Sequence, residues 1–213
     1  MASAEITKYF ETAENRKIRE ALVFAVENII EPKIAIDCGC GAGADINYLV
    51  SKGFKVYGFD VEEESISRCE ARYKNVENVI LSKSTFSTYN YPKASLVVAD
   101  ASLFFCPESE FSDVWKNIYE CLVLNGIFCG SFLGTEDTMA DPDYDRSAFW
   151  PDVAVFDEGG VRKLFVNYEI LRFNVHKTSG MTAQGVTPNW HIFSVVARKS
   201  SKCFRSDLVL QGT

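Results

Sequence analysis

The stretch Lys33-Ile-Ala-Ile-Asp-Cys-Gly-Cys-Gly-Ala-Gly43 decides how this chain folds. A short apolar run ends at Asp37, three glycines follow at alternate positions, and residues 44–52 then have a helical composition. A second apolar run, residues 56–59, ends in another acid, Asp60. Strand, glycine turn, helix, strand and acid is the order of a nucleotide-binding βαβ unit. The glycines let the backbone bend tightly and approach a ligand closely.

The spacing of the glycines and the position of Asp37 narrow the choice of ligand. A dinucleotide-binding turn reads G-x-G-x-x-G and places a pyrophosphate on the helix N-terminus. Here the spacing is G-x-G-x-G, and Asp37 precedes the first glycine by two residues. A carboxylate there would repel a pyrophosphate but suits a ligand with an ammonium group. A nicotinamide-dependent oxidoreductase is therefore disfavoured, and Asp60 is placed to bind a ribose diol.

The segment Asp37-Cys-Gly-Cys-Gly-Ala-Gly43 resembles the first motif of the class I methyltransferases, D/E-x-G-x-G-x-G. The resemblance implies S-adenosylmethionine as cofactor and S-adenosylhomocysteine as product. It implies an α/β fold in which a doubly wound (Rossmann-like), seven-stranded, mostly parallel sheet with an antiparallel last strand lies between two helical layers. The cofactor contacts that it implies here are Asp37, Gly39, Cys40, Gly41, Gly43, Asp60 and Val61.

Further cofactor contacts follow from the same resemblance. Where the family offers an acid to the adenine, this chain has Ser84, Thr85 and Phe86, so hydroxyl or backbone groups are expected to replace the acid. Asp100 ends the fourth predicted strand at the same sheet edge. In the family the leading segment often folds over the cofactor, which adds Tyr9 and Arg16; the alternative is a polar helix start exposed to solvent.

Apolar periodicity predicts alternating helices and strands over the rest of the chain. Asn125-Gly126 is interpreted as a left-handed cap that ends the helix before the fifth strand, and Asp157 as the N-cap of the last helix. One domain is expected over residues 1–199, with a tail over 200–213. The predicted helices cover 15–30, 44–52, 62–74 and 158–165, and the predicted strands 34–36, 56–59, 79–81, 96–99, 127–133, 169–175 and 191–198.

The second half of the chain resembles a narrower branch, the tellurite-resistance methyltransferases and their relatives. Residues 103–107 (Leu-Phe-Phe-Cys-Pro), Trp115, residues 134–140 and Trp190-His-Ile-Phe193 match, in order, its motifs L-P-F-C-P, F-G-x-x-D-x-W and W-H-x-F. Phe104 replaces a proline of the branch and Met139 a tryptophan. The resemblance implies a small methyl acceptor, such as a thiol or a tellurium or selenium oxyanion.

Two residues are candidates for handling that acceptor. His191 could serve as a general base at neutral pH, or it could be a satisfied core histidine. Asp137 could orient the acceptor or simply cap a turn. Residues 134–156 form a long, aromatic segment at the active-site edge, which predicts a substrate lid that includes Trp150.

Composition bounds the remaining possibilities. The 213 residues are 47% hydrophobic and carry a net charge of −7, which disfavours nucleic-acid and anionic-membrane partners. The seven cysteines form no disulfide framework, and Cys38 and Cys40 have no second Cys/His pair to complete a metal site. No secretory segment precedes Lys33, so a cytoplasmic location is expected. A monomer or homodimer and no bound metal are also expected. A non-catalytic S-adenosylmethionine sensor on the same fold stays open as the alternative to an enzyme.

Overall fold

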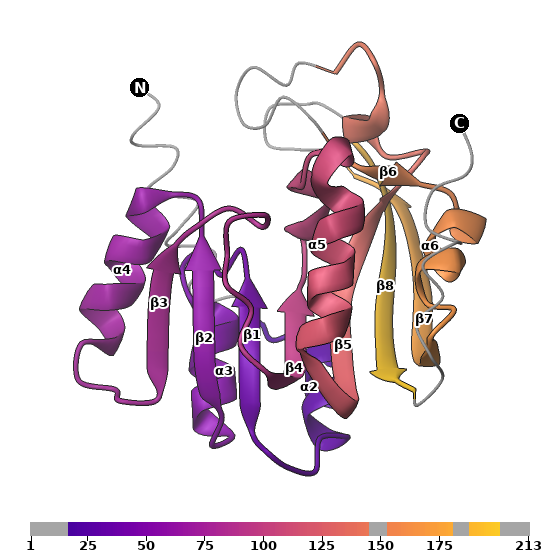
Figure 1. Cartoon of the computed structure of the whole chain (residues 1–213). Helices are drawn as coiled ribbons and strands as arrows, with labels where there is room; N and C mark the ends of the chain where they lie inside the picture. The colour runs from indigo at the N-terminus through magenta and orange to yellow at the C-terminus, as the bar shows by residue number, and fades with distance from the viewer. Residues whose placement is uncertain (1–16, 145–152, 181–187, 201–213) are drawn as a thin grey trace.

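A computed structural model describes residues 17–144, 153–180 and 188–200 and has one central sheet (Figure 1). The strand order is β3-β2-β1-β4-β5-β8-β7, and β8 is antiparallel to both of its neighbours. The two-residue strand β6 was not predicted and pairs with the end of β5. The strands are β1 Ile34–Cys38, β2 Lys55–Asp60, β3 Val79–Lys83, β4 Ala94–Ala99, β5 Leu122–Gly134, β6 Val155–Phe156, β7 Tyr168–Ser179 and β8 Asn189–Lys199.

Helices cover both faces of this sheet. The α-helices are α2 Glu20–Glu27, α3 Ala44–Ser51, α4 Glu63–Tyr73, α5 Glu108–Cys121 and α6 Glu158–Leu164, with single 3-10 turns η1 Leu103–Phe105 and η2 Thr138–Ala140. One buried cluster joins α2, α3 and α4 to one sheet face, and the other joins α5 and α6 to the opposite face. Neighbouring strand residues such as Ala35 and Ile36 fall in different clusters, because successive side chains point to opposite faces. The predicted doubly wound, three-layer fold is confirmed.

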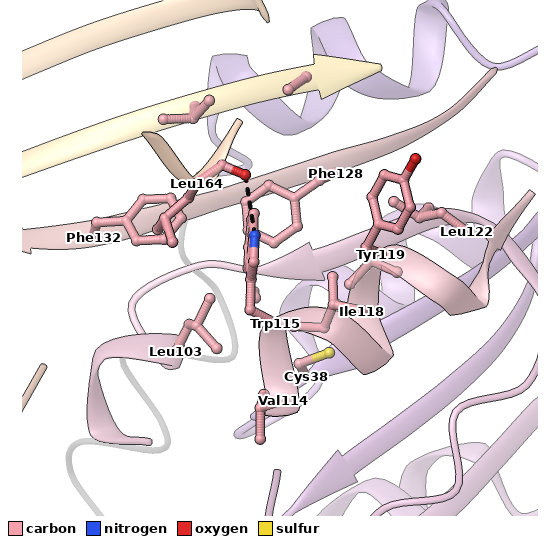
Figure 2. Packing of buried hydrophobic residues seen from close by; sticks show 14 of the residues in the cluster. Cys38, Leu103, Val114, Trp115, Ile118, Tyr119, Leu122, Phe128, Phe132 and Leu164 are labelled. Atoms are coloured by element: carbon pink, nitrogen blue, oxygen red, sulfur yellow. Dashed lines mark hydrogen bonds between the residues drawn. The ribbon is translucent and has the colours of Figure 1, made fainter. Parts of the chain in front are cut away.

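The cluster under α5 is built around Trp115 (Figure 2). Its side chain is 1% exposed, and its ring meets Phe128 and Phe165 edge-on at centroid distances of 5.0 and 5.2 Å. The indole Nε1–H donates to the Leu164 carbonyl oxygen at 3.1 Å. Trp115 therefore joins α5, β5 and the end of α6 in one core. This packing holds the carboxyl end of β5 in place.

The prediction that Asn125-Gly126 caps the helix before the fifth strand is wrong. Helix α5 ends at Cys121, and β5 begins immediately at Leu122. Asn125 does have a positive φ of 63°, but it lies inside β5, where the pairing with β4 skips from Leu122 to Ile127. The Asn-Gly pair thus forms an irregularity in a strand, because an αL residue can serve a bulge as well as a helix end.

The segment predicted as a lid is partly regular structure. Asp137 starts the turn η2, and Val155 and Phe156 return as β6 beside Leu133 and Gly134. The Ala154 N–H also donates to the Phe104 carbonyl oxygen at 2.7 Å. The returning limb therefore packs beyond the end of β4. Residues 145–152, with Trp150, lie outside the described residues.

The leading helix is shorter than predicted in its described part, spanning only Glu20–Glu27. Within the described residues, no helix combines the length and the apolar character needed to cross a bilayer.

We predict that Trp115→Ala lowers the free energy of unfolding by about 3–5 kcal/mol, because it leaves a large cavity and an unpaired carbonyl group. Urea denaturation measures the change. Trp190→Ala is the matched control: that side chain is 42% exposed, so its loss should cost less than about 1 kcal/mol. Equal losses in the two variants would contradict the central place of Trp115.

Candidate functional site

The glycine turn between β1 and α3 adopts a conformation that glycine favours. Gly39, Gly41 and Gly43 have φ angles of 71°, 50° and 80°. The N–H groups of Gly39 and Cys40 both donate to the carbonyl oxygen of Phe59, at 2.8 and 2.9 Å. These two bonds fix the turn to the end of β2. The positive φ angles explain why three glycines stand at alternate positions in the sequence.

The other side of the turn is held by α4, which sequence reasoning missed. Cys69, Arg72 and Tyr73 donate to the carbonyl oxygens of residues 41, 42 and 43, at 3.3, 3.1 and 2.8 Å. The sequence predicted only a helix over residues 62–74 here. Three consecutive carbonyl groups are thus directed toward α4. The turn is clamped from two sides before any ligand binds.

Asp60 lies at the carboxyl end of β2 and contacts the turn directly. Its carboxylate accepts from the Gly41 N–H at 2.8 Å and from the Glu62 N–H at 2.9 Å. Burial raises the pKa of Asp60 above its ordinary value, while these backbone donors and that of Val61 act to lower it. Val61 leaves 37% of its surface exposed beside the carboxylate. An acid and an apolar surface here match the two parts of a nucleoside.

Asp37 is buried at 4% exposure in β1, between Gly58 of β2 and Val98 of β4. It precedes the first glycine of the turn by two residues, so the carboxylate and the turn lie at the same sheet edge. Within the turn, a hydrogen bond with Cys69 and burial raise the pKa of the Cys40 thiol well above its ordinary value. Over the described part of the chain, no cluster of three or more His, Cys, Asp or Glu side chains is suited to a metal ion.

The three residues after β3 are placed unequally. The Ser84 N–H donates to the Asp60 carbonyl oxygen at 3.0 Å, which brings Ser84 to the predicted ribose site. The Thr85 hydroxyl lies 2.9 Å from that of Thr88 in a local turn. Phe86 packs edge-on against Phe59, with 5.5 Å between ring centroids. Of these three residues, Ser84 is the one whose backbone is bonded to Asp60.

Asp100, at the end of β4, forms an ion pair with Arg19, which precedes α2. The sequence gave no signal for this pairing, although it predicted that the leading segment would come to this edge. Tyr9 and Arg16, the residues chosen for that role, lie outside the described residues. Ala101 follows with a positive φ of 53°, and its N–H donates to the Ser131 hydroxyl of β5 at 2.7 Å.

Asp137 caps the turn after β5, one of its two predicted alternatives. Its Oδ1 accepts from the Met139 N–H at 2.9 Å, and its Oδ2 accepts from the backbone N–H of His191 at 2.8 Å. The side chain is only 5% exposed. Both carboxylate oxygens therefore accept hydrogen bonds from backbone N–H groups, and Asp137 joins the turn η2 to the start of β8.

His191 lies across from the end of β5 and is 4% exposed. Its Nδ1 accepts from the Glu136 N–H at 3.1 Å. The ring covers Gly134 so closely that a Cβ added there would lie 2.4 Å from it. Nε2 is buried and has no hydrogen-bond partner among the residues that the structure describes. Among the described residues, only one of the two ring nitrogens of His191 therefore has a hydrogen-bond partner.

A cavity of about 330 Å³ lies at this end of the β7–β8 hairpin. Its walls include the ion pair between Lys177 and Glu136 (Nζ to Oε1, 2.5 Å). Its lining residues are Glu136, Lys177, Thr178, Ser179, Asn189, Trp190 and His191. Sequence reasoning singled out Trp190 and His191 and missed the others. Glu136 falls at an unspecified position of the matched segment 134–140, and the remaining residues lie on no recognised motif.

Comparison with known proteins agrees with this geometry. Residues 35–126, which span the glycine turn, Asp60 and Asp100, match a family model described as a methyltransferase domain. This match confirms the predicted resemblance to class I methyltransferases and, at the level of the family, the predicted enzyme class and its cofactor. No curated protein matches the chain by sequence.

Solved structures share the fold of this chain over most of its length. TehB from Haemophilus influenzae is 20% identical with a TM-score of 0.72, and the match covers 92% of this chain and 67% of that one. A SAM-dependent methyltransferase from Methanosarcina mazei is 18% identical with a TM-score of 0.66, covering 88% and 100%. The 1,6-didemethyltoxoflavin-N1-methyltransferase of Burkholderia thailandensis is 16% identical with a TM-score of 0.65, covering 94% and 87%.

We predict that alanine substitutions at Gly39 and Gly41 affect different properties of the protein, stability in the first case and cofactor binding in the second. A Cβ at Gly39 would lie 2.6 Å from the Ser102 Cβ, whereas a Cβ at Gly41 meets nothing within 4 Å. Both variants carry backbone strain of about 1–2 kcal/mol, so Gly39→Ala should lose additional stability through its clash. Gly41→Ala should stay folded yet bind S-adenosylmethionine at least about tenfold more weakly, a loss of about 1.4 kcal/mol.

Urea denaturation and calorimetric titration separate the two effects, and each variant serves as the control for the other. Unchanged binding by a folded Gly41→Ala variant would show that the cofactor does not approach this face of the turn.

Proposed function

We propose that this chain is an S-adenosylmethionine-dependent methyltransferase that acts on a small molecule. The observation that carries the proposal is the clamped glycine turn, with the Asp60 carboxylate bound to the Gly41 N–H inside the matched domain. The M. mazei relative is named as SAM-dependent, and the B. thailandensis structure holds S-adenosylhomocysteine with its acceptor. These relatives support the same activity here.

The residues present fit the cofactor. The side of Gly41 where a Cβ would stand is open, so the backbone can be approached there. We assign the buried carboxylate of Asp37 to the ammonium group, Asp60 to the ribose, and Val61 with Ser84 to the adenine. The exposed apolar surface of Val61 suits a planar ring. When bound, S-adenosylmethionine supplies a methyl group on a sulfonium, which is a very good leaving group.

The protein's own task is then to orient the acceptor and to exclude water. Holding reacting groups in line lowers the barrier by several kcal/mol without any further catalytic group. We assign acceptor binding to the cavity beside His191, because it lies at the carboxyl end of β5, on the edge where doubly wound sheets bind ligands. Asp137 acts there by fixing the turn and the start of β8. A thiol and a tellurium or selenium oxyanion remain the candidate acceptors.

We expect Asp60→Ala to weaken S-adenosylmethionine binding by about 1.5–3 kcal/mol, the scale of a charge-assisted hydrogen bond. Calorimetric titration with S-adenosylmethionine and S-adenosylhomocysteine measures it. Asp157→Ala is the matched control, since Asp157 also accepts a backbone N–H, from Gly160 at 2.6 Å, but at the start of α6. That variant should bind the cofactor like the wild type.

Turnover is tested by following S-adenosylhomocysteine formation with thiols, selenite and tellurite as acceptors. Product that appears only with an acceptor present supports the proposed activity. Tight cofactor binding without product across the panel would favour the non-catalytic sensor. Tight binding of NAD instead would end the assignment.

A further inference from the structure

The imidazole of His191 is held in one orientation and one tautomer. Its Nδ1 accepts a hydrogen bond from the Glu136 N–H, and the ring lies between Gly134 and Phe193, whose ring centroid is 4.7 Å away. A ring nitrogen that accepts an N–H donor carries no proton itself. In the neutral ring the proton therefore resides on Nε2. The tautomer follows from the hydrogen-bond network rather than from a visible hydrogen.

This arrangement differs from that of a histidine general base. A base that takes a proton at Nε2 holds its own proton on Nδ1, usually donated to a carboxylate. Here Nδ1 faces the Glu136 N–H, so a proton on Nδ1 would set two donors against each other. The nearby carboxylate of Asp137 does not face the ring nitrogen, because its oxygens accept from the backbone N–H groups of Met139 and His191.

What remains is a buried donor with no acceptor. Nε2 makes no hydrogen bond within the described part of the chain, although the side chain is 96% buried. A buried donor without a partner is costly and rare, so it calls for an explanation such as a functional role. His191 also lines the cavity of about 330 Å³ at the hairpin end. The unsatisfied N–H group therefore belongs to a residue that lines a space of ligand size, although Nε2 itself is buried.

We propose that His191 recognises the methyl acceptor by donating its Nε2–H to an oxygen of that molecule. The acceptor therefore carries a carboxylate, carbonyl or oxyanion oxygen, and a bare alkyl thiol is a poor substrate, because sulfur is a weak hydrogen-bond acceptor. The Glu136 carboxylate in the wall is paired with Lys177, which offsets its charge toward such an oxygen. The proposal rests on the proposed methyltransferase function and names the substrate class of that site.

Two substitutions separate donor, base and structural roles. In His191→Gln the amide nitrogen takes the place of Nε2 and donates but cannot act as a base. In His191→Asn the amide oxygen takes the place of Nδ1 and keeps the Glu136 hydrogen bond without the donor. We expect His191→Gln to keep kcat/KM within about threefold of wild type and His191→Asn to lose at least about tenfold. Equal loss in both, or greater loss in His191→Gln, overturns the donor role.

A second measurement does not depend on turnover. The chain has only two histidines, so ¹⁵N-histidine NMR of the full chain resolves His191 against His176, with His191→Asn giving the assignment. We expect the Nε2–H tautomer for His191. Mercaptoacetate and selenite should shift its Nε2 resonance, and ethanethiol at the same concentration should not. A protonated Nδ1, or an Nε2 signal that responds to neither oxygen-bearing probe, overturns the proposal.

The two proposals fail in different ways. Absence of S-adenosylmethionine binding by the wild type contradicts the proposed function, whereas the tautomer and the probe response of His191 are measured without the cofactor.

Discussion

The hydrogen bond from the Gly41 N–H to the Asp60 carboxylate joins the two halves of the nucleotide-binding unit. It connects the turn after β1 to the end of β2, which parallel pairing brings side by side through Cys38 and Phe59. An acceptor of this kind keeps the turn amide satisfied while leaving one side of Gly41 open. Together with the two hydrogen bonds to the Phe59 carbonyl oxygen, this contact fixes the turn against the end of β2.

Helix α4 completes the same constraint from the other side. The crossover that follows β2 returns α4 over the turn, so that Arg72 and Tyr73 reach the carbonyl groups of residues 42 and 43. The turn is thus rigid because its donors and its acceptors are both used. Preorganisation of this sort lowers the entropic cost of ordering the turn when a ligand binds.

The far end of the site follows a different design. Around β5, β8 and η2, polar side chains accept hydrogen bonds from the backbone. Asp137 accepts from the N–H of His191 at the start of β8, and the Thr138 hydroxyl accepts from the Asn189 N–H at 2.7 Å. The Glu136–Lys177 pair adds a link across to β7. The Nε2 of His191 has no hydrogen-bond partner among the described residues. Rigid backbone and one directed donor suit recognition of a small acceptor.

The sequence by itself determined the order of the elements, the glycine turn and the acid at the end of β2. These are local patterns: an apolar run predicts a strand, alternating glycines predict a tight turn, and an acid directly after a strand falls at its carboxyl end. The fold class and the resemblance to class I methyltransferases followed from them. The Asn125-Gly126 interpretation failed because the same local conformation serves a helix cap and a strand irregularity.

Only the tertiary structure decided which distant side chains meet. Arg19 pairs with Asp100, α4 donates hydrogen bonds to the turn, and the Glu136 N–H sets the tautomer of His191. Each of these contacts joins residues that are many positions apart in the sequence. No periodicity encodes such contacts, because they depend on sheet register and on how crossovers return to the sheet. His191 shows this most clearly: the sequence could place it on a strand near the active-site edge, but the partner of its Nδ1 fixes what its Nε2 can do.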